Sequence, residues 1–173
     1  MNIKGEKVLL RAIEPKDNSM LLDIINDGET EYMLGGWSFP VSQRNQEDWT
    51  NNLKSEKDTL RCAIDVGSEA IGVVMLTGID YKNGNAEVHI KLSLKDVRGK
   101  GYGSDALMTI VQYAFLELRL KCIYAKVSKH NGISQSMFKK CGFNEEGILK
   151  SRLYKQGQYV DVISFSKINE DLR

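Results

Sequence analysis

Glycines and basic residues alternate in one short segment, residues 97–106, with the sequence VRGKGYGSDA. Its basic and glycine residues are Arg98, Gly99, Lys100, Gly101 and Gly103. Glycines let backbone N–H groups approach an anion, and the first turn of a helix adds unpaired donors and a partial positive charge. Because an apolar stripe of helical spacing follows, the segment predicts a phosphate-binding loop at a helix N-terminus.

The same segment also fits a dinucleotide-binding fingerprint. Residues 101–106 match G-x-G-x-x-G/A, which expects an acidic residue about 20 positions later to hold the ribose hydroxyls. The next expected strand ends in KVSKH, residues 126–130, which has no carboxylate. An NADP site tolerates cations there, so an NADP-binding oxidoreductase remains an alternative.

The N-terminal part of the chain reads as a strand followed by a helix. The strand is expected over residues 7–13, and the helix from a cap at Asp17 or Asn18 to a stop at Gly28. After a loop, a polar helix should begin at a Ser42 cap. Its Trp49 is expected to anchor that helix on the core.

Three strands are expected next, separated by turn residues. They cover residues 59–66, 70–79 and 85–92. Gly67-Ser68 joins the first two, and Lys82-Asn83-Gly84 leads into the third. Short turns between consecutive strands predict an antiparallel meander.

A helix and a strand follow the glycine-rich segment. The apolar stripe of this helix consists of Leu107, Ile110, Val111, Ala114, Phe115 and Leu118. With a strand at 121–128 it forms a βαβ unit, so its two strands should be parallel. A short helix at 131–140, closed by Gly142, and terminal strands at 144–154 and 159–168, which flank a turn at Gln156-Gly157, complete the chain. We expect an α/β (α+β) fold with a mixed, mostly antiparallel sheet and flanking helices.

Length and composition restrict the class of protein. With 173 residues, 42% of them apolar, the chain can form one domain over residues 1–173 with a hydrophobic core. A net charge of +1 gives no support to nucleic-acid binding, and no apolar run approaches the ~20 residues of a membrane span. Three widely spaced cysteines suit a reduced, cytoplasmic location. His89 and His130 are far apart, so no metal centre is expected.

Charge is distributed unevenly along the chain. Residues 1–90 carry a net charge of −6, whereas residues 91–141 carry +7. A basic middle suits a polyanionic cofactor, and an acidic N-terminal half suits a cationic substrate. Asp27, Glu29 and Glu31, with the loop at 34–37, could shape an amine site.

Taken together, these motifs resemble the GCN5-related N-acetyltransferase (GNAT) family over nearly the whole chain. Arg98, Gly101 and Gly103 match its acetyl-CoA signature R/Q-x-x-G-x-G/A, and Asn131 and Ser134 match N-x-x-S. A K-x-G-F ending follows at residues 140–143. The V-x-L-R pattern within residues 8–17, with its following Pro and Asp, is similar to the branch of ribosomal-protein and polyamine N-acetyltransferases.

The resemblance implies acetyl-CoA as co-substrate, held between splayed strands at 85–92 and 121–128. Pyrophosphate would bind the amides of residues 99–104, pantetheine would lie along residues 90–93, and Lys139 could meet the adenosine phosphate. The implied cofactor-binding residues are Ile90, Leu92, Ser93, Arg98, Gly99, Lys100, Gly101, Tyr102, Gly103, Ser104, Asn131, Ser134, Phe138 and Lys139. The partner would be a small-molecule or peptide amine, and the branch implies a possible homodimer.

Acetyl transfer needs a neutral amine, donors for the oxyanion and a proton for the departing thiolate. Glu87 and His89 share one face of their strand, and the resemblance makes Glu87 the general base, acting through water. A solvated strand residue is the alternative for Glu87, and His89 is read as a packing or hydrogen-bonding residue.

The proton donor is less straightforward. Many family members use a tyrosine five positions before the Phe of G-F, where this chain has Phe138, which cannot donate a proton. The ribosomal-protein branch implies Ser134 as the acid instead, although a serine there could equally cap its helix. Because the tyrosine is missing, a non-catalytic acyl-CoA sensor is a second alternative.

Overall fold

The computed structural model describes residues 1–35, 39–54, 56–93, 97 and 99–172. Within them the strands form one sheet in the order β1-β2-β3-β4-β5-β6-β8-β7. The strands are β1 (Ile3–Lys4), β2 (Leu9–Arg11), β3 (Leu60–Val66), β4 (Glu69–Asp80), β5 (Asn85–Leu92), β6 (Cys122–Ser128), β7 (Asn144–Lys155) and β8 (Gln158–Ile168). The helices are the 3-10 helix η1 (Pro15–Asp17), α1 (Asn18–Asn26), α2 (Gly28–Met33), α3 (Gln43–Asn51), α4 (Tyr102–Leu116) and α5 (Gly132–Lys140).

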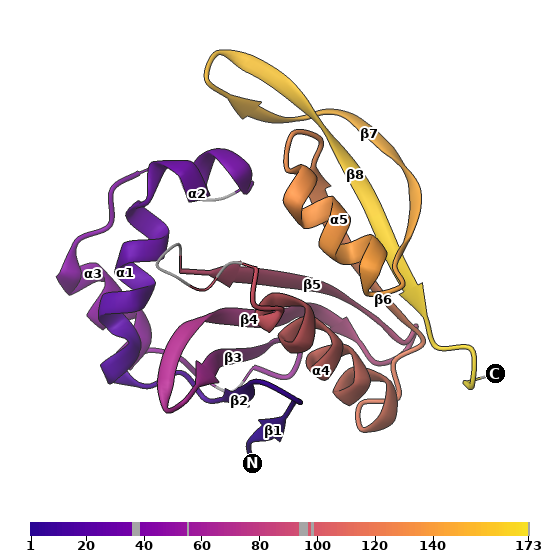
Figure 1. Ribbon diagram of the computed structural model, residues 1–173, viewed down its shortest axis with the longest axis horizontal. Helices are drawn as coiled ribbons and strands as arrows, with labels where there is room; N and C mark the ends of the chain where they lie inside the picture. Colours follow the sequence, from indigo (N-terminus) through magenta and orange to yellow (C-terminus); the bar gives the residue numbers. More distant parts are fainter. Residues whose placement is uncertain (36–38, 55, 94–96, 98, 173) are drawn as a thin grey trace.

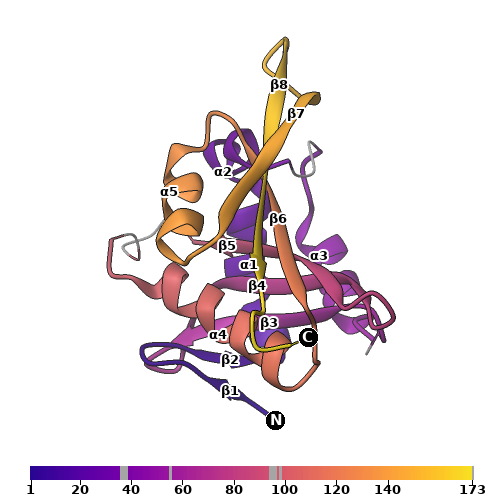
Figure 2. The same ribbon diagram turned by 90° about the vertical axis from the view of Figure 1, so that its right-hand side faces the viewer.

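Helices lie on both sides of this sheet. Figure 2 shows α4 and α5 on one side and α1 and α3 on the other. Strands β7 and β8 close one edge of the sheet, and the turn end of their hairpin projects beyond the other strands, above α5 (Figure 1). This is the expected mixed α/β architecture, mostly antiparallel, with flanking helices.

The apolar stripe of α4 packs into the core. Leu107, Ile110, Val111 and Ala114 are fully buried there, against β-strand residues such as Phe165. Full burial of a large aliphatic side chain contributes about 1.5–3 kcal/mol each. Four of the six predicted stripe residues are thus buried and fix α4 against the sheet. Phe115 and Leu118 are partly buried against the core, and Leu118 lies beyond the end of α4 at Leu116.

Two tight turns take the predicted residues. Gly67 and Ser68 have φ of 59° and 74°, and Gln156 and Gly157 have 45° and 82°. Two successive positive φ values are typical of a type I′ hairpin turn, whose twist matches that of its strands. The turns join β3 to β4 and β7 to β8.

Strands β5 and β6 form the one parallel pair among the described strands. They pair at three positions only, Asn85 with Cys122, Ala86 with Ile123 and Glu87 with Tyr124. Beyond Glu87 and Tyr124 they diverge, and α4 connects them as the crossover. This splayed pair, implied by the family resemblance, opens the sheet where side chains from both strands can meet a ligand.

One expectation about the N-terminal helices is confirmed and one is wrong. The first helix ends at Asn26 with Asp27 as its C-cap, so it stops before Gly28 as expected. The Asp27 carboxylate also accepts the N–H of Thr30 at 2.6 Å and starts a further helix, α2, at Gly28. Trp49 is 43% exposed rather than anchored in the core. Ser42 caps α3 as expected, accepting the N–H of Asn45, but the buried face of α3 is polar.

Arg11 joins two nearly buried carboxylates beside η1. Its guanidinium donates to Asp17 at 2.8 Å and to Asp65 at 2.7 and 2.9 Å. The side chains of Arg11, Asp17 and Asp65 are only 10%, 2% and 8% exposed. Burial raises the pKa of Asp17, but hydrogen bonds from Arg11 and the Glu14 N–H outweigh it, so the pKa lies below its usual value.

Asp17→Asn should therefore lower the free energy of unfolding by about 3 kcal/mol at pH 7, because it leaves part of a buried guanidinium unpaired. Since the folded-state pKa is depressed, this stabilisation is present above the unfolded-state value. It should disappear as the pH falls below about 4. Urea unfolding at several pH values measures both effects.

Asp48→Asn is the matched control, because Asp48 forms an exposed pair with Arg44 on α3. It should change the unfolding free energy by less than about 0.5 kcal/mol. Equal losses in the two variants, or a loss at Asp17 that does not depend on pH, would contradict the role of the Arg11 network.

Candidate active site

The divergence of β5 and β6 leaves a cleft of about 680 Å³, called here the large cleft. Its walls come from β5, β6, the end of α2, the start of α5 and the β7–β8 hairpin. The polar and charged residues that line it are Thr77, Glu87, His89, Lys91, Lys126, Ser128, Asn131, Ser134 and Arg152. Such a mixture of apolar walls and convergent polar groups is typical of a substrate site.

Glu87 lies in this cleft, as the sequence predicted for a candidate base. Its carboxylate accepts a hydrogen bond from Lys126 at 2.9 Å, and its side chain is 17% exposed. This hydrogen bond and ion pair raise the pKa of Lys126 above its usual value. Glu87 is therefore a partly buried, ion-paired carboxylate rather than a solvated strand residue.

His89 shares this face of β5 and also lines the large cleft. Its Nε2 lies 2.9 Å from the Thr77 hydroxyl. Burial is the main cause that lowers the pKa of His89, with Glu87 opposing it and Lys91 and Lys126 adding to it. His89 is thus neutral near pH 7, and it has the hydrogen bond that the sequence reading gave it.

The first turn of α5 borders the large cleft. The side chain of Asn131 accepts the N–H of Ser134 at 3.0 Å and so caps the helix. Ser134 therefore is not the cap of α5. It lies in the first turn of that helix and lines the large cleft. Phe138 lines the same cleft and is 3% exposed, with Phe143 edge-on at 5.0 Å and Phe165 stacked at 6.0 Å.

A second, smaller cleft of about 150 Å³ adjoins the first and is called here the small cleft. It is lined by Ile90 and Leu92 of β5 and by Ile133 and Met137 of α5. Lys91, Asn131 and Ser134 line both clefts, which places them at their junction. The N–H of Ser93, the next predicted residue, bonds the Ile71 carbonyl at 2.8 Å. A narrow apolar groove of this kind fits an extended arm such as pantetheine.

The glycine segment lies at the start of α4, as predicted. Gly99 and Gly101 have φ of 80° and 83°, and Gly101 is the N-cap residue. A side chain at Gly103 would lie 3.1 Å from Leu92 and 3.3 Å from Met137, so glycine lets α4 approach the small cleft. Lys100, Tyr102 and Ser104 lie in the same segment, and Arg98 lies outside the described residues.

A cation that the sequence did not indicate joins this segment. Lys7 donates from Nζ to the Lys100 carbonyl at 3.1 Å, and a Cβ at Gly101 would lie 3.0 Å from the same Nζ. The Asp105 carboxylate holds Lys7 there, accepting the N–H groups of Glu6, Lys7 and Val8 at 3.2, 2.7 and 3.0 Å. The first turn of α4 thus binds the β1–β2 turn, and Lys7 adds positive charge to the candidate phosphate site.

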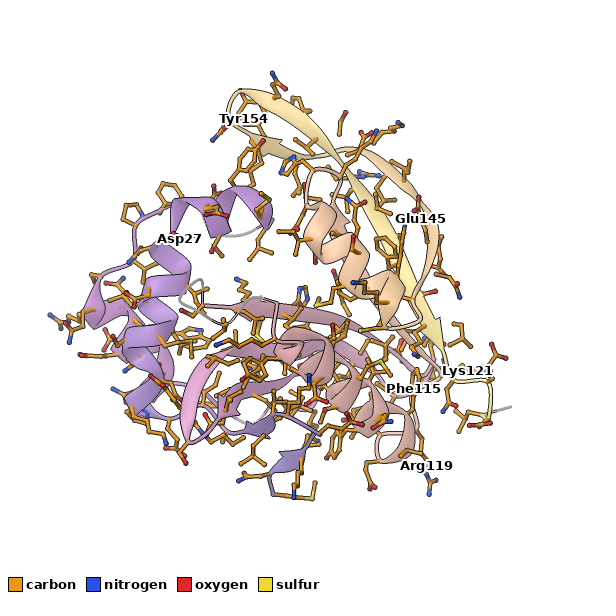
Figure 3. All side chains as sticks on the ribbon, viewed as in Figure 1. Asp27, Phe115, Arg119, Lys121, Glu145 and Tyr154 are labelled. Carbon is orange, nitrogen blue, oxygen red and sulfur yellow. The ribbon has the colours of Figure 1, made fainter. Side chains whose placement is uncertain are left out.

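The remaining predicted residues are distributed around the clefts. Lys139 pairs with Glu145 at 3.3 Å, near the base of the hairpin where Figure 3 labels Glu145. Its contact with an adenosine phosphate stays a prediction. Asp27 caps α2, Glu31 pairs with Lys155, and Glu29 lines the small cleft. Of the loop at 34–37, residues 36 and 37 lie outside the described part of the chain.

Sequence reasoning missed several cleft residues. The lining residues that were not predicted are Lys91, Lys126, Ser128 and Arg152. Lys91 follows Glu87 and His89 at a spacing of two, and Lys126 and Ser128 lie within the strand expected at 121–128, so their places in the strands were the available signal. Among the described residues no cluster of three or more His, Cys, Asp or Glu could hold a metal ion. In that same part of the chain, no helix has the length and apolarity needed to cross a membrane.

Comparison with known proteins identifies relatives over most of the chain. A family model for the acetyltransferase (GNAT) domain matches residues 7–144. An uncharacterized N-acetyltransferase of Bacillus licheniformis is 32% identical over 96% of this chain and 95% of its own length. A spermidine N(1)-acetyltransferase of Vibrio cholerae is 33% identical over 91% of each chain. The crystal structure of spermidine N-acetyltransferase from Vibrio cholerae with CoA and spermine superposes with a TM-score of 0.85, at 25% identity over 94% of this chain and 95% of that one.

Proposed function

The chain belongs to the GNAT family of acetyl-CoA-dependent N-acetyltransferases, and from that premise we propose that it acetylates a primary amine by direct attack on the thioester. The acceptor would be a small molecule or a peptide amine that enters the large cleft. One observation carries this proposal. The two clefts meet at residues 91, 131 and 134, between the helix start that suits phosphate and the carboxylate that suits an amine.

Each part of acetyl-CoA has a corresponding part of the protein. The pyrophosphate would bind the N–H groups at the start of α4, with Lys7 and Lys100 supplying charge. The pantetheine arm would lie in the small cleft along Ile90 and Leu92. The thioester would then reach the junction of the two clefts, next to Ser134.

Chemistry at the junction needs a base for the ammonium and a proton for the thiolate. We assign the base to Glu87, acting through water, because it is the carboxylate among the described lining residues of the large cleft. Ser134 is the proposed proton donor, since Asn131 performs the capping and Phe138 has no proton to give. The neutral His89 is a hydrogen-bonding residue beside the base.

Three related proposals accompany the function. Residues 1–173 would form one catalytic domain, the cytoplasm would be its location, and the active form could be a homodimer. The cysteines support the second, since Cys62, Cys122 and Cys141 are free thiols and burial raises the pKa of each. Light scattering during gel filtration tests the third.

Titration calorimetry with acetyl-CoA, followed by thiol release with a panel of amines, tests the function. We expect acetyl-CoA to bind at one site and CoA release to require an amine. Binding without release for every amine would support the acyl-CoA sensor instead. NADPH binding that survives excess CoA, with no binding of acetyl-CoA, would support the oxidoreductase and contradict the proposal.

A further inference from the structure

We infer that the acceptor amine carries a carboxylate or phosphate group, and that Arg152 binds this anion in the large cleft. The inference rests on the proposed function and deepens it by naming the substrate class. It differs from the expectation of a cationic substrate that the charge distribution along the chain suggested. The charges of the cleft, the backbone around Arg152 and a buried hydroxyl support it.

Positive charge dominates the described lining of the large cleft. Lys91, Lys126 and Arg152 are basic side chains, and Glu87 is the carboxylate that opposes them. Burial lowers the pKa of Lys91, so an anion beside it would stabilise its charged form. The hydrogen bond from Lys126 to Glu87 pairs these two groups, and His89 is neutral. A polyamine would bring further positive charge next to Lys91 and Arg152. An amine with an anionic group instead offers each of them an opposite charge.

Arg152 is available for such an anion. Its side chain is exposed, and among the described residues it makes no ion pair and no hydrogen bond. A guanidinium presents five N–H donors in a planar arrangement that matches carboxylate and phosphate oxygens. Binding would therefore need no existing contact of Arg152 to break.

A bulge in β7 places Arg152 at the cleft. Leu149 pairs with Val162 and Leu153 with Val160, so the three residues 150–152 stand opposite Asp161 alone. Extra residues in one strand redirect its side chains and are found next to functional sites. Leu149, Arg152 and Leu153 all line the large cleft as a result.

Asp161 stabilises this bulge from the facing strand. Its carboxylate accepts the N–H of Ser151 at 3.1 Å and pairs with Lys150 at 3.1 Å and Lys129 at 3.4 Å. Ser151 has a φ of 52°, which a serine adopts rarely. Several contacts thus fix the backbone that carries Arg152. A fixed backbone suits a residue that binds a ligand.

A second observation points to a polar ligand in the same cleft. The hydroxyl of Ser128 is buried and has no hydrogen-bond partner among the described residues, and Ser128 lines the large cleft. Buried hydroxyls almost always have a partner. A polar substrate, directly or through water, would supply it. Apolar side chains between these groups, such as Met75 and Leu149, would contact the body of the substrate.

Calorimetry on the CoA-saturated protein tests the inference without turnover. The probes are two matched pairs, L-leucine with L-leucinamide and glucosamine 6-phosphate with glucosamine, together with spermidine. We expect the anionic member of at least one pair to bind about tenfold more tightly than its partner and than spermidine. The pair that shows the difference identifies the anion as carboxylate or phosphate.

Three variants connect this preference to Arg152. Arg152→Gln should remove most of the advantage of the anionic amine, and Arg152→Glu should reverse it in favour of spermidine. Arg44→Gln, at a side chain that is 90% exposed on α3, should retain it. Melting temperatures within a few degrees of the parent establish that the variants are folded.

The outcomes separate this inference from the proposed function. Arg152-dependent binding of an anionic amine without CoA release from acetyl-CoA would support the inference and contradict the function. The inference would be overturned if the parent bound spermidine as tightly as or more tightly than both anionic amines. It would also be overturned if, in both pairs, the member without the anionic group bound equally or more tightly, even if those amines are acetylated. An Arg152→Gln effect that is the same for all probes would overturn it as well.

Discussion

Gly101→Ala is expected to weaken acetyl-CoA binding on the order of 30-fold. Gly101 caps α4 at a φ of 83°, where an alanine costs about 1–2 kcal/mol. Alanine would relax away from this conformation and turn backbone N–H groups off the phosphate site. Its Cβ would also lie 3.0 Å from the Lys7 ammonium and displace it. Titration calorimetry with acetyl-CoA measures the change.

Gly157→Ala is the matched control. Gly157 has a φ of 82°, but nothing lies within 4 Å of a Cβ there, and it sits in the β7–β8 turn. Both variants should lose similar stability, since both strain the backbone in the same way. Only Gly101→Ala should lose acetyl-CoA affinity. If both variants bound acetyl-CoA with the same affinity, the glycine segment would not be part of the cofactor site.

Glu87→Gln should lower kcat/KM about 10²- to 10³-fold at pH 7, with little change in the dissociation constant of acetyl-CoA. The glutamine keeps the shape of the side chain but cannot accept the proton of the ammonium. Because a primary ammonium has a pKa of about 10.4, the rate of the variant should rise with pH as the free amine becomes more abundant. Initial rates of CoA release between neutral and alkaline pH measure both effects.

Glu56→Gln is the control for this experiment. Glu56 accepts a hydrogen bond of 3.0 Å from Arg61, and it lines neither cleft. It tests whether loss of any ion-paired carboxylate lowers the rate. Its kcat/KM should equal that of the parent. A Glu87→Gln rate within about threefold of the parent would assign deprotonation of the amine to another group or to solvent.

Local chemistry explains what could be predicted from the sequence. The glycine segment and the stripe of α4 are adjacent in the chain, so their spacing alone indicated a helix start with a phosphate site. The helix at 131–140 was likewise predicted from local residues, although Asn131 caps it and Ser134 does not. The type I′ turns followed from their residues because turn geometry depends on only two positions.

Contacts between distant segments could not be predicted in this way. Lys7 reaches the glycine segment through Asp105, 98 residues later. Arg152 lines the large cleft because Asp161 on the facing strand holds a bulge. The position of Lys7 depends on its contact with Asp105, and that of Arg152 on the strand register opposite Asp161. Neither can be read from the residues that neighbour Lys7 or Arg152 in the sequence.

The error at Trp49 has a related cause. A periodicity argument assigns the largest apolar side chain to the core, yet α3 packs on α1 through hydrogen bonds. Thr50 bonds Asn18 at 2.5 Å and lies with Gln46 on the buried face. The face of α3 that is buried against α1 is therefore determined by polar contacts between the two helices and not by hydrophobicity.

The most direct test of acetyl transfer is mass spectrometry of a single turnover with the enzyme in excess over acetyl-CoA, with and without an accepted amine. Direct attack predicts that the amine gains one acetyl group for each CoA released. It also predicts that the intact protein keeps its mass when the amine is omitted. Acetyl-CoA that stays intact with every amine, or a protein that gains an acetyl group before the amine is added, would contradict the account.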